Sequence, residues 1–128
     1  MTTIKQRYGQ VQDRIAAAAA RSGRDASDIH LVAVTKYASV DDVRQLVDLG
    51  HVDFAESRLQ HFTQIAAQID EYIGRRKELG EPNLASPIRW HFIGHLQRNK
   101  CRRVIPLSRM IHSVDSLRLA EEIQELAC

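Results

Sequence analysis

The segment Ile29-His30-Leu31-Val32-Ala33-Val34-Thr35 decides the fold, and Lys36 follows it directly. It is a short, nearly continuous apolar run that is rich in β-branched residues. Such a run is typical of a strand that is buried on both faces, as in a parallel sheet. We therefore expect a first β-strand over residues 29–35, with Lys36 at its C-terminal end.

Helices and strands alternate on both sides of this segment. Residues 3–22 carry apolar side chains at helical spacing and are followed by Gly23, which predicts an amphipathic helix before the first strand. Ser39 and Asp42 form a start of the capping-box type for the helix that follows Lys36. The same patterns predict further strands over 52–55, 88–93 and 110–114, helices over 39–49, 59–73, 96–105 and 116–126, and a loop over 80–87.

This alternation indicates right-handed crossovers between parallel strands, and therefore an α/β fold with four strand–helix units after an N-terminal helix. Four units make either a small open sheet or half of a (β/α)8 TIM-type barrel, whose whole form needs about 250 residues. A chain of 128 residues has the length of one ordinary domain. We expect a single domain over residues 1–128.

Composition argues against several classes of protein. The chain has 18 basic and 16 acidic residues, a balance that makes nucleic acid or an anionic membrane an improbable main partner. No apolar run approaches the length of a membrane span, and the N-terminus lacks a signal-peptide core. Cys101 and Cys128 form no CxxC pair and the histidines no metal-binding motif, so we expect reduced thiols, a cytoplasmic protein and no metal site.

The C-terminal ends of the strands carry the candidate functional residues, because parallel α/β folds place their sites there. Lys36 stands out among them, since it directly follows five uncharged residues that would place its amine at the mouth of the core. Partial desolvation there would favour the neutral, nucleophilic amine that Schiff-base chemistry requires. On spacing alone, however, an ordinary solvated lysine is the more common interpretation.

Other strand-end residues have equally ordinary interpretations. His91 alternates with Trp90 and Phe92, which favours a buried, hydrogen-bonded histidine over a catalytic base. The basic residues of 98–103 form a solvated helix face by default, with binding of a phosphate or an acidic partner as the alternative. Two carboxylates at strand ends could each orient a neighbour or cap a helix, and the sequence does not decide between these roles; they are Glu56 and Asp115.

Two blocks of the sequence resemble one known family. Residues 31–36, Leu31-Val32-Ala33-Val34-Thr35-Lys36, resemble the lysine strand of the pyridoxal 5′-phosphate (PLP) homeostasis protein family, the single-domain relatives of the alanine racemase barrel. Residues 90–100 resemble the most distinctive motif of that family, and residues 112–116 fit the segment after its fourth strand. The resemblance covers essentially the whole chain, but only about the first half of the family's usual length.

The resemblance implies the N-terminal half of a PLP-binding TIM-type barrel, with the cofactor held as an internal aldimine on Lys36. It also implies cofactor contacts from Val34, Ser57, His91 and Ile93. Family members are regarded as regulators or carriers in intracellular PLP homeostasis, so we expect no catalytic turnover and assign no catalytic residue.

The chain departs from the family pattern in two places. Residues 55–57 are Ala-Glu-Ser where the family often has Gly-Glu-Asn. This chain therefore lacks the asparagine side chain whose amide makes the usual contact, although the Ser57 hydroxyl could still lie near the cofactor. The phosphate-binding loops of the family lie in a C-terminal half that the resemblance does not cover, and residues 125–128 end in the middle of a predicted helix. We expect either a truncated form of a longer protein or a homodimer whose two copies pair into an eight-stranded barrel.

Two other functions stay open at this point. The first is a half-barrel fragment without cofactor or activity, because the phosphate anchor is missing. The second is a PLP-dependent amino-acid racemase, which needs an acid or base on the opposite face of the cofactor, typically a tyrosine from another domain. Three tyrosines are present, and none lies at a convincing strand end for that role; they are Tyr8, Tyr37 and Tyr72.

Overall fold

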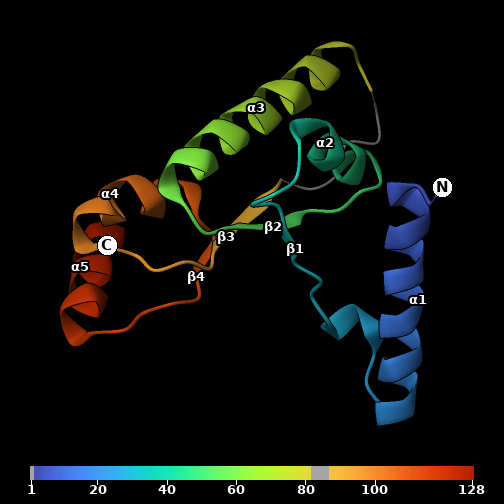
Figure 1. The fold of residues 1–128 in the computed structure, drawn as a ribbon, viewed down its shortest axis with the longest axis horizontal. Coiled ribbons are helices and arrows are strands. Elements are labelled where there is room, and N and C mark those ends of the chain that lie inside the picture. The colour runs from blue at the N-terminus through green and yellow to red at the C-terminus, as the bar shows by residue number, and fades with distance from the viewer. Residues whose placement is uncertain (1, 82–86) are drawn as a thin grey trace.

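The computed structural model of this chain describes residues 2–81 and 87–128. Its elements alternate between strands and helices after a long first helix (Figure 1). In chain order they are α1 (Ile4–Ser22), η1 (Ala26–Asp28), β1 (Ala33–Val34), α2 (Val40–Asp48), β2 (Asp53–Glu56), α3 (Leu59–Glu78), β3 (Arg89–Phe92), η2 (Arg98–Lys100), α4 (Cys101–Val104), η3 (Ile105–Leu107), β4 (Met110–Ile111) and α5 (Leu117–Ala127). None of the helices within the described ranges has the length and apolar character needed to cross a membrane.

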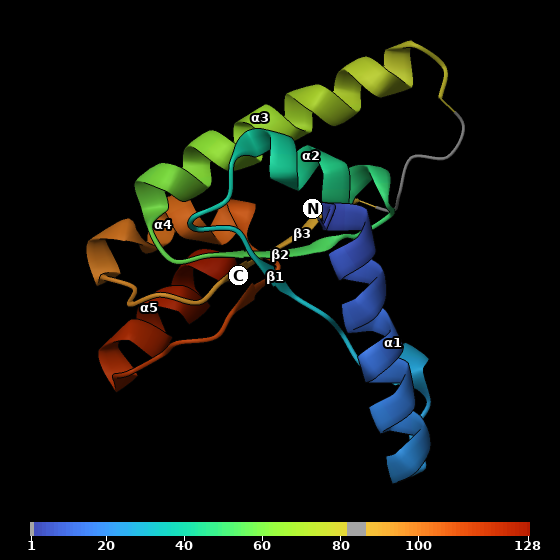
Figure 2. The same ribbon diagram turned by 45° about the vertical axis from the view of Figure 1, so that its right-hand side comes forward.

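The four strands form one parallel sheet in the order β1-β2-β3-β4. Helices α2, α3 and α4 lie on one side of this sheet, and the opposite face is not covered by any described helix (Figure 2). The predicted α/β class with four parallel strand–helix units is therefore confirmed. One face packed by helices and one open face are the arrangement of half a TIM-type barrel.

The core lies between the sheet and α3. Phe54 of β2 and Trp90 of β3 are buried, with ring centroids 5.5 Å apart. Phe62 of α3 packs on both β3 aromatics, at 5.6 Å from Trp90 and 6.1 Å from Phe92. Burial of such large apolar side chains supplies most of the energy that holds the helix on the sheet, about 2–3 kcal/mol for each of them.

The N-terminal helices begin where the sequence predicts. Thr3 caps α1 in a capping box with Gln6, and Gly23 ends the helix with a φ of 73°. Ser39 caps α2 in a capping box with Asp42, as predicted. Helix α1 packs beside α2 at the β1 edge of the sheet (Figure 1).

The two outer strands are shorter than predicted. Strand β1 covers residues 33–34 of the predicted 29–35, and β4 covers 110–111 of the predicted 110–114. Within the described residues each of them pairs with one neighbour only, so flanking residues lack a partner on the other side. The inner strands β2 and β3 each have four residues, because both sides of each are hydrogen-bonded.

The prediction of one continuous helix over residues 96–105 is wrong in its extent. Residues 98–107 instead form a 3-10 turn, a four-residue α-helix and a second 3-10 turn. Leu96 precedes these turns and is buried in the core, which holds the segment before them in an extended loop. Pro106 lies in the first turn of η3, where a missing N–H costs little, so the chain continues through it instead of stopping.

The loop predicted over 80–87 lies largely outside the described residues, which resume at Pro87. Gly80, with a φ of 75°, ends the long helix α3 before it.

Candidate functional site

The residues expected to form the site share one face of the sheet. The register aligns Val34, Ala55, His91 and Met110 across the four strands. Two residues further along each strand come Lys36, Ser57, Ile93 and His112. Because aligned residues of parallel strands project to the same side, the first row belongs to the face opposite the helices, and the second row follows directly after the ends of the four strands. The structure thus places all five of the predicted residues in, or directly after, the C-terminal ends of three neighbouring strands.

Lys36 lies in a turn just beyond β1. The Ala38 N–H donates a hydrogen bond of 3.0 Å to the Thr35 carbonyl, so Lys36 and Tyr37 occupy the two corners of this turn. The Lys36 side chain is exposed, and its Nζ lies 5.2 Å from the centroid of the Tyr37 ring. The expected partial desolvation of the amine is not found, because Lys36 is exposed in the turn beyond the end of β1.

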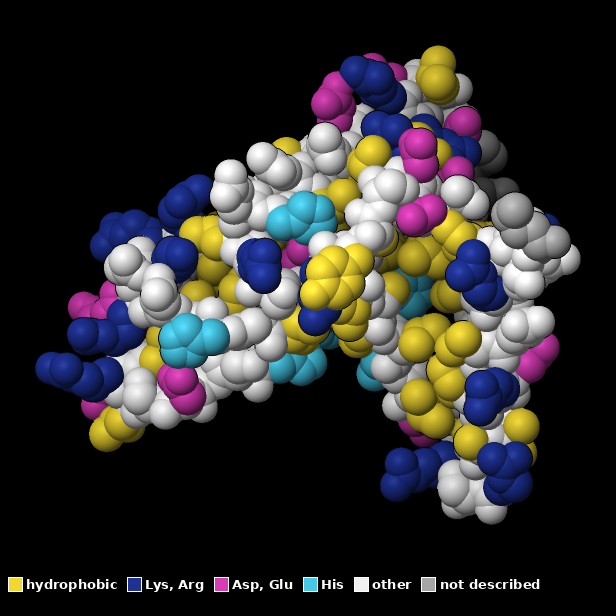
Figure 3. Space-filling model, in the orientation of Figure 1, with side chains coloured by type: hydrophobic (Ala, Val, Ile, Leu, Met, Phe, Trp, Pro, Cys, Tyr) yellow, Lys and Arg dark blue, Asp and Glu magenta, His cyan; other side chains and the backbone are white. Residues whose placement is uncertain are grey.

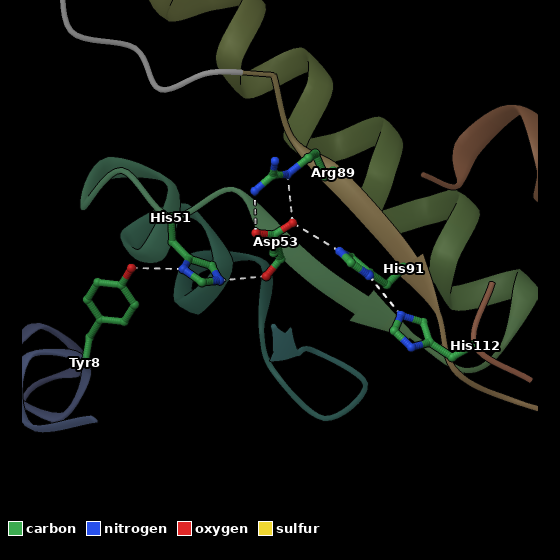
Figure 4. Close-up of polar contacts among 6 residues, drawn as sticks. All are labelled: Tyr8, His51, Asp53, Arg89, His91 and His112. Carbon is green, nitrogen blue, oxygen red and sulfur yellow. Dashed lines mark hydrogen bonds and ion pairs between the residues drawn. The ribbon is translucent and has the colours of Figure 1, made fainter. Parts of the chain in front are cut away.

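A polar network crosses the open face of the sheet below this edge (Figure 4). Asp53 accepts two hydrogen bonds from the Arg89 guanidinium, at 2.8 and 2.7 Å, and its Oδ1 lies 3.0 Å from His91 Nε2. His91 Nδ1 in turn lies 2.9 Å from His112 Nε2. His91 is 7% exposed, so its predicted state as a buried, hydrogen-bonded histidine is confirmed.

Asp53 is the charged centre of this network. Burial by itself would raise the pKa of the Asp53 carboxyl, but the hydrogen bonds from Arg89 and His91 outweigh it and hold that pKa below its ordinary value. An ionised Asp53 accepts the Nε2–H of His91, which leaves His91 Nδ1 to share a proton with His112. The network therefore fixes the imidazole of His112 at the same edge as Lys36.

A third histidine, His51, extends the network toward α1. His51 Nε2 donates to the backbone carbonyl of Asp53 at 2.6 Å, so its Nδ1 accepts from the Tyr8 hydroxyl at 2.9 Å. Burial lowers the pKa of His51, which keeps the ring neutral in this position. Tyr8 thus has a structural role between α1 and the sheet (Figure 4).

The loops that follow β2 and β3 touch each other at the site. A Cβ atom on Gly94 would collide with the carbonyl oxygen of Ser57, so no side chain fits at this position. The Ser113 hydroxyl donates to the Ile93 carbonyl at 3.1 Å, which ties the end of β4 to the same place. The C-terminal edge is therefore closely packed, and glycine at position 94 is a steric requirement.

The structure does not bring the basic segment 98–103 into this face. Its charged side chains are exposed on η2 and α4, as expected for a solvated helix surface. The network around Asp53 was not among the features predicted from the sequence. Its signal was present, since Asp53, Arg89 and His91 are polar residues inside otherwise apolar strands, and Arg89 and His91 are spaced so that they share a face.

Known proteins that are similar to this chain indicate the family to which it belongs. No protein-family model matches the chain. A curated relative named pyridoxal phosphate homeostasis protein, from Pseudomonas aeruginosa, is 35% identical over 98% of this chain and 48% of its own length. A structure of PipY from Synechococcus elongatus, solved with PLP bound, matches 91% of this chain and 47% of its own with a TM-score of 0.66 and 28% identity.

A third match is a crystal structure of an unknown protein from Bifidobacterium adolescentis, with a TM-score of 0.72 and 36% identity over 91% of this chain. The chain spans about half the length of the curated relatives it matches. The similarity of sequence and fold extends over nearly all of this chain. The chain belongs to the pyridoxal phosphate homeostasis protein family, of which it represents the N-terminal half.

Proposed function

We propose that this chain binds PLP covalently through Lys36 and takes part in intracellular PLP homeostasis as a carrier or regulator, without catalytic turnover. The observation that supports the proposal is the exposed primary amine of Lys36. This amine follows the C-terminal end of β1, in a chain that matches the N-terminal half of the family's barrel. The PLP-bound relative PipY has the same fold over this half, which adds to that support.

The residues at this edge fit the aldehyde and the ring of PLP. Lys36 takes part in none of the ion pairs between described residues, so its amine is accessible to an aldehyde. Val34 and Ile93 offer apolar surface on the same face, and Ser57 offers a hydroxyl. We expect the residues that anchor the phosphate in the half of the family's length that this chain does not span.

When bound, PLP supplies an aldehyde that bonds reversibly to amines and can exchange between them. The part of the protein would be to present the exposed Lys36 amine, whose nitrogen would bond to the aldehyde carbon while the aldehyde oxygen leaves as water with the two amine hydrogens. The apolar side chains of Val34 and Ile93 would exclude water from the ring face. Without a phosphate anchor, we expect this chain alone to retain PLP weakly.

The test is an absorbance titration of the chain with PLP, compared with two lysine variants. We expect the band of lysine-bound PLP in the wild type and in Lys100→Ala, which removes an exposed lysine on η2 as the matched control. The Lys36→Ala variant should lose the band. A band of equal strength in Lys36→Ala contradicts the proposal.

We also propose that two copies of this chain pair through their open sheet edges, with β4 of one copy beside β1 of the other. Apolar grooves of about 250 and 370 Å³ flank the two edges. Apolar side chains gather along the side of α1 that faces the sheet (Figure 3), and Val34 and Met110 on the edge strands are each 51% exposed. Exposed strand edges of this kind favour pairing with another chain.

The helices beside the two edges carry opposite charge. Helix α1, at the β1 edge, has four basic residues and one acidic residue, and α5, at the β4 edge, has three acidic residues and one basic residue. Head-to-tail pairing would therefore place opposite charges together at both contacts.

Sedimentation at increasing salt tests this pairing. We expect a dimer at low salt that dissociates as salt screens the helix charges, and a monomer for Met110→Asp on the β4 edge. A monomer at every protein and salt concentration contradicts it. We also propose a cytoplasmic location for the protein. The two free cysteines, Cys101 and Cys128, support this location, because thiols stay reduced in the cytoplasm.

A further inference from the structure

Glu56, the last residue of β2, is a carboxylate with 0% of its surface exposed. The register aligns it with the core residue Phe92, so its side chain lies on the helix-covered face and not beside the amine of Lys36. Moving a carboxylate out of water is unfavourable by several kcal/mol unless it is well partnered. The residues that contact the Glu56 carboxylate therefore indicate its role in the structure.

Glu56 contacts side chains from both neighbouring segments. One carboxylate oxygen accepts a short hydrogen bond from the Thr35 hydroxyl at the end of β1. The other lies 2.6 Å from Nδ1 of His61, in the first turn of α3. Thr35 is 1% exposed, and its backbone N–H donates to the Ala55 carbonyl at 3.0 Å. The carboxylate thus connects the ends of β1 and β2 with the start of α3.

Thr35 is also the first residue of the turn that carries Lys36. Its carbonyl accepts the Ala38 N–H that closes the turn, at 3.0 Å. Strand β1 has only two residues and one neighbour among the described strands, so backbone pairing alone fixes its end weakly. The Thr35 hydroxyl lies within hydrogen-bond distance of both the Ala55 carbonyl, at 3.2 Å, and the Glu56 carboxylate, and these side-chain contacts add a fixed point directly before Lys36.

We propose that Glu56 is a positioning residue for Lys36 that acts through the Thr35 hydroxyl. The proposal rests on the proposed attachment of PLP to Lys36. The buried carboxylate holds Thr35, Thr35 holds the turn, and the turn directs the Lys36 amine toward the open face of the sheet. His61 secures the opposite side of the same carboxylate.

Two substitutions at position 35 separate positioning from stability. Thr35→Val keeps the shape and β-branching of the side chain but removes the hydroxyl. Thr35→Ser keeps the hydroxyl and removes a buried methyl group, so it lowers stability without breaking the contact. Unfolding followed by the fluorescence of Trp90, the single tryptophan, reports the stability of both variants.

The first readout is the ratio of PLP trapped by borohydride on Lys36 to PLP trapped on Lys100 in the same folded sample. Loss of a hydrogen bond to a charged group should lower this ratio about tenfold in Thr35→Val. Thr35→Ser should keep the wild-type ratio despite its lower stability. An unchanged ratio in Thr35→Val, with preferential labelling of Lys36 in the wild type, overturns the proposal.

The second readout does not depend on PLP. Amide exchange of Ala38 reports the turn, and exchange of the His112 N–H, which bonds to Phe92 between β3 and β4, is the reference. We expect faster exchange at Ala38 relative to this reference in Thr35→Val and not in Thr35→Ser. If PLP does not label Lys36 in the wild type, the proposed function fails. The exchange experiment is independent of that result, and equal Ala38 exchange in Thr35→Val and Thr35→Ser contradicts the positioning role.

A matched pair at position 56 completes the test. Glu56→Gln keeps an oxygen that accepts from Thr35, whereas Glu56→Met fills the same space without an acceptor. The glutamine variant should restore the Lys36 ratio and the Ala38 exchange to within about threefold of wild type, and the methionine variant should not. Equal behaviour of the two variants contradicts a role through the Thr35 hydroxyl.

Discussion

Replacing Asp53 by asparagine should destabilise the fold, because Asp53 is the charged centre of the network on the open face. The Asp53 side chain is 8% exposed and binds Arg89 through two hydrogen bonds and His91 through one. Removing one member of a fully buried ion pair costs about 3–5 kcal/mol. Arg89 is 40% exposed and regains water when its partner is lost, so we expect about 2–3 kcal/mol here.

Urea unfolding followed by the fluorescence of Trp90 measures this loss. With a slope of about 1.5 kcal/mol per M of urea, the midpoint should fall by roughly 1.3–2 M. Asp41→Asn is the matched control, because Asp41 and its partner Arg44 form an exposed pair, and its effect should stay within about 0.5 kcal/mol.

The loss of stability in Asp53→Asn should depend on pH, and the direction follows from the pKa of Asp53. The pKa of Asp53 is lower in the folded protein than its ordinary value, so its contribution is fully present above that value and is lost as the pH falls through the folded pKa. The difference between wild type and Asp53→Asn should therefore be constant near neutral pH and shrink below about pH 4. A variant within about 0.5 kcal/mol of wild type at pH 7, or a difference that persists into acid, refutes the reasoning.

Two further predictions follow from the same structure. Gly94→Ala should destabilise by about 1–3 kcal/mol in urea unfolding because its Cβ would meet the Ser57 carbonyl, whereas Gly74→Ala, in the open on α3, should stabilise by about 0.5–1 kcal/mol. The reverse order of these two variants would contradict the close approach of the two loops. Burial lowers the pKa of His51, so wild-type stability should decrease as the pH falls below about 6.5, and His51→Gln should remove part of that decrease in unfolding curves measured from pH 7.5 to 5. Parallel curves for the two proteins would show that His51 does not carry this dependence.

Much of the fold could be predicted from local sequence signals. The capping residue Ser39 and the glycine after α1 each act on their own segment, and each lies where the sequence predicts. The extent of β1 and β4 could not be predicted, because it depends on how many neighbours a strand has. The broken helix after residue 96 depends on the burial of Leu96, which is a tertiary effect.

The candidate site could be predicted only in part. The sequence places Lys36 at a strand end, but its exposure follows from the position of β1 at the edge of the sheet. For Glu56 the sequence leaves open whether it orients a neighbour or caps a helix, and the structure shows that it contacts Thr35 and His61. The contact between Asp53 and Arg89 joins residues 36 positions apart, which no local pattern reveals.

Locating the lysine that bonds to PLP tests the central claim most directly. The chain has four lysines, Lys5, Lys36, Lys77 and Lys100, so peptide mapping by mass spectrometry after borohydride reduction can assign every site. Lys36 should carry most of the label at low PLP concentration, and the other three should be labelled only when PLP is in large excess. Equal labelling of all four lysines, or a label that stays on the protein in Lys36→Ala at low PLP, would contradict the assignment of Lys36.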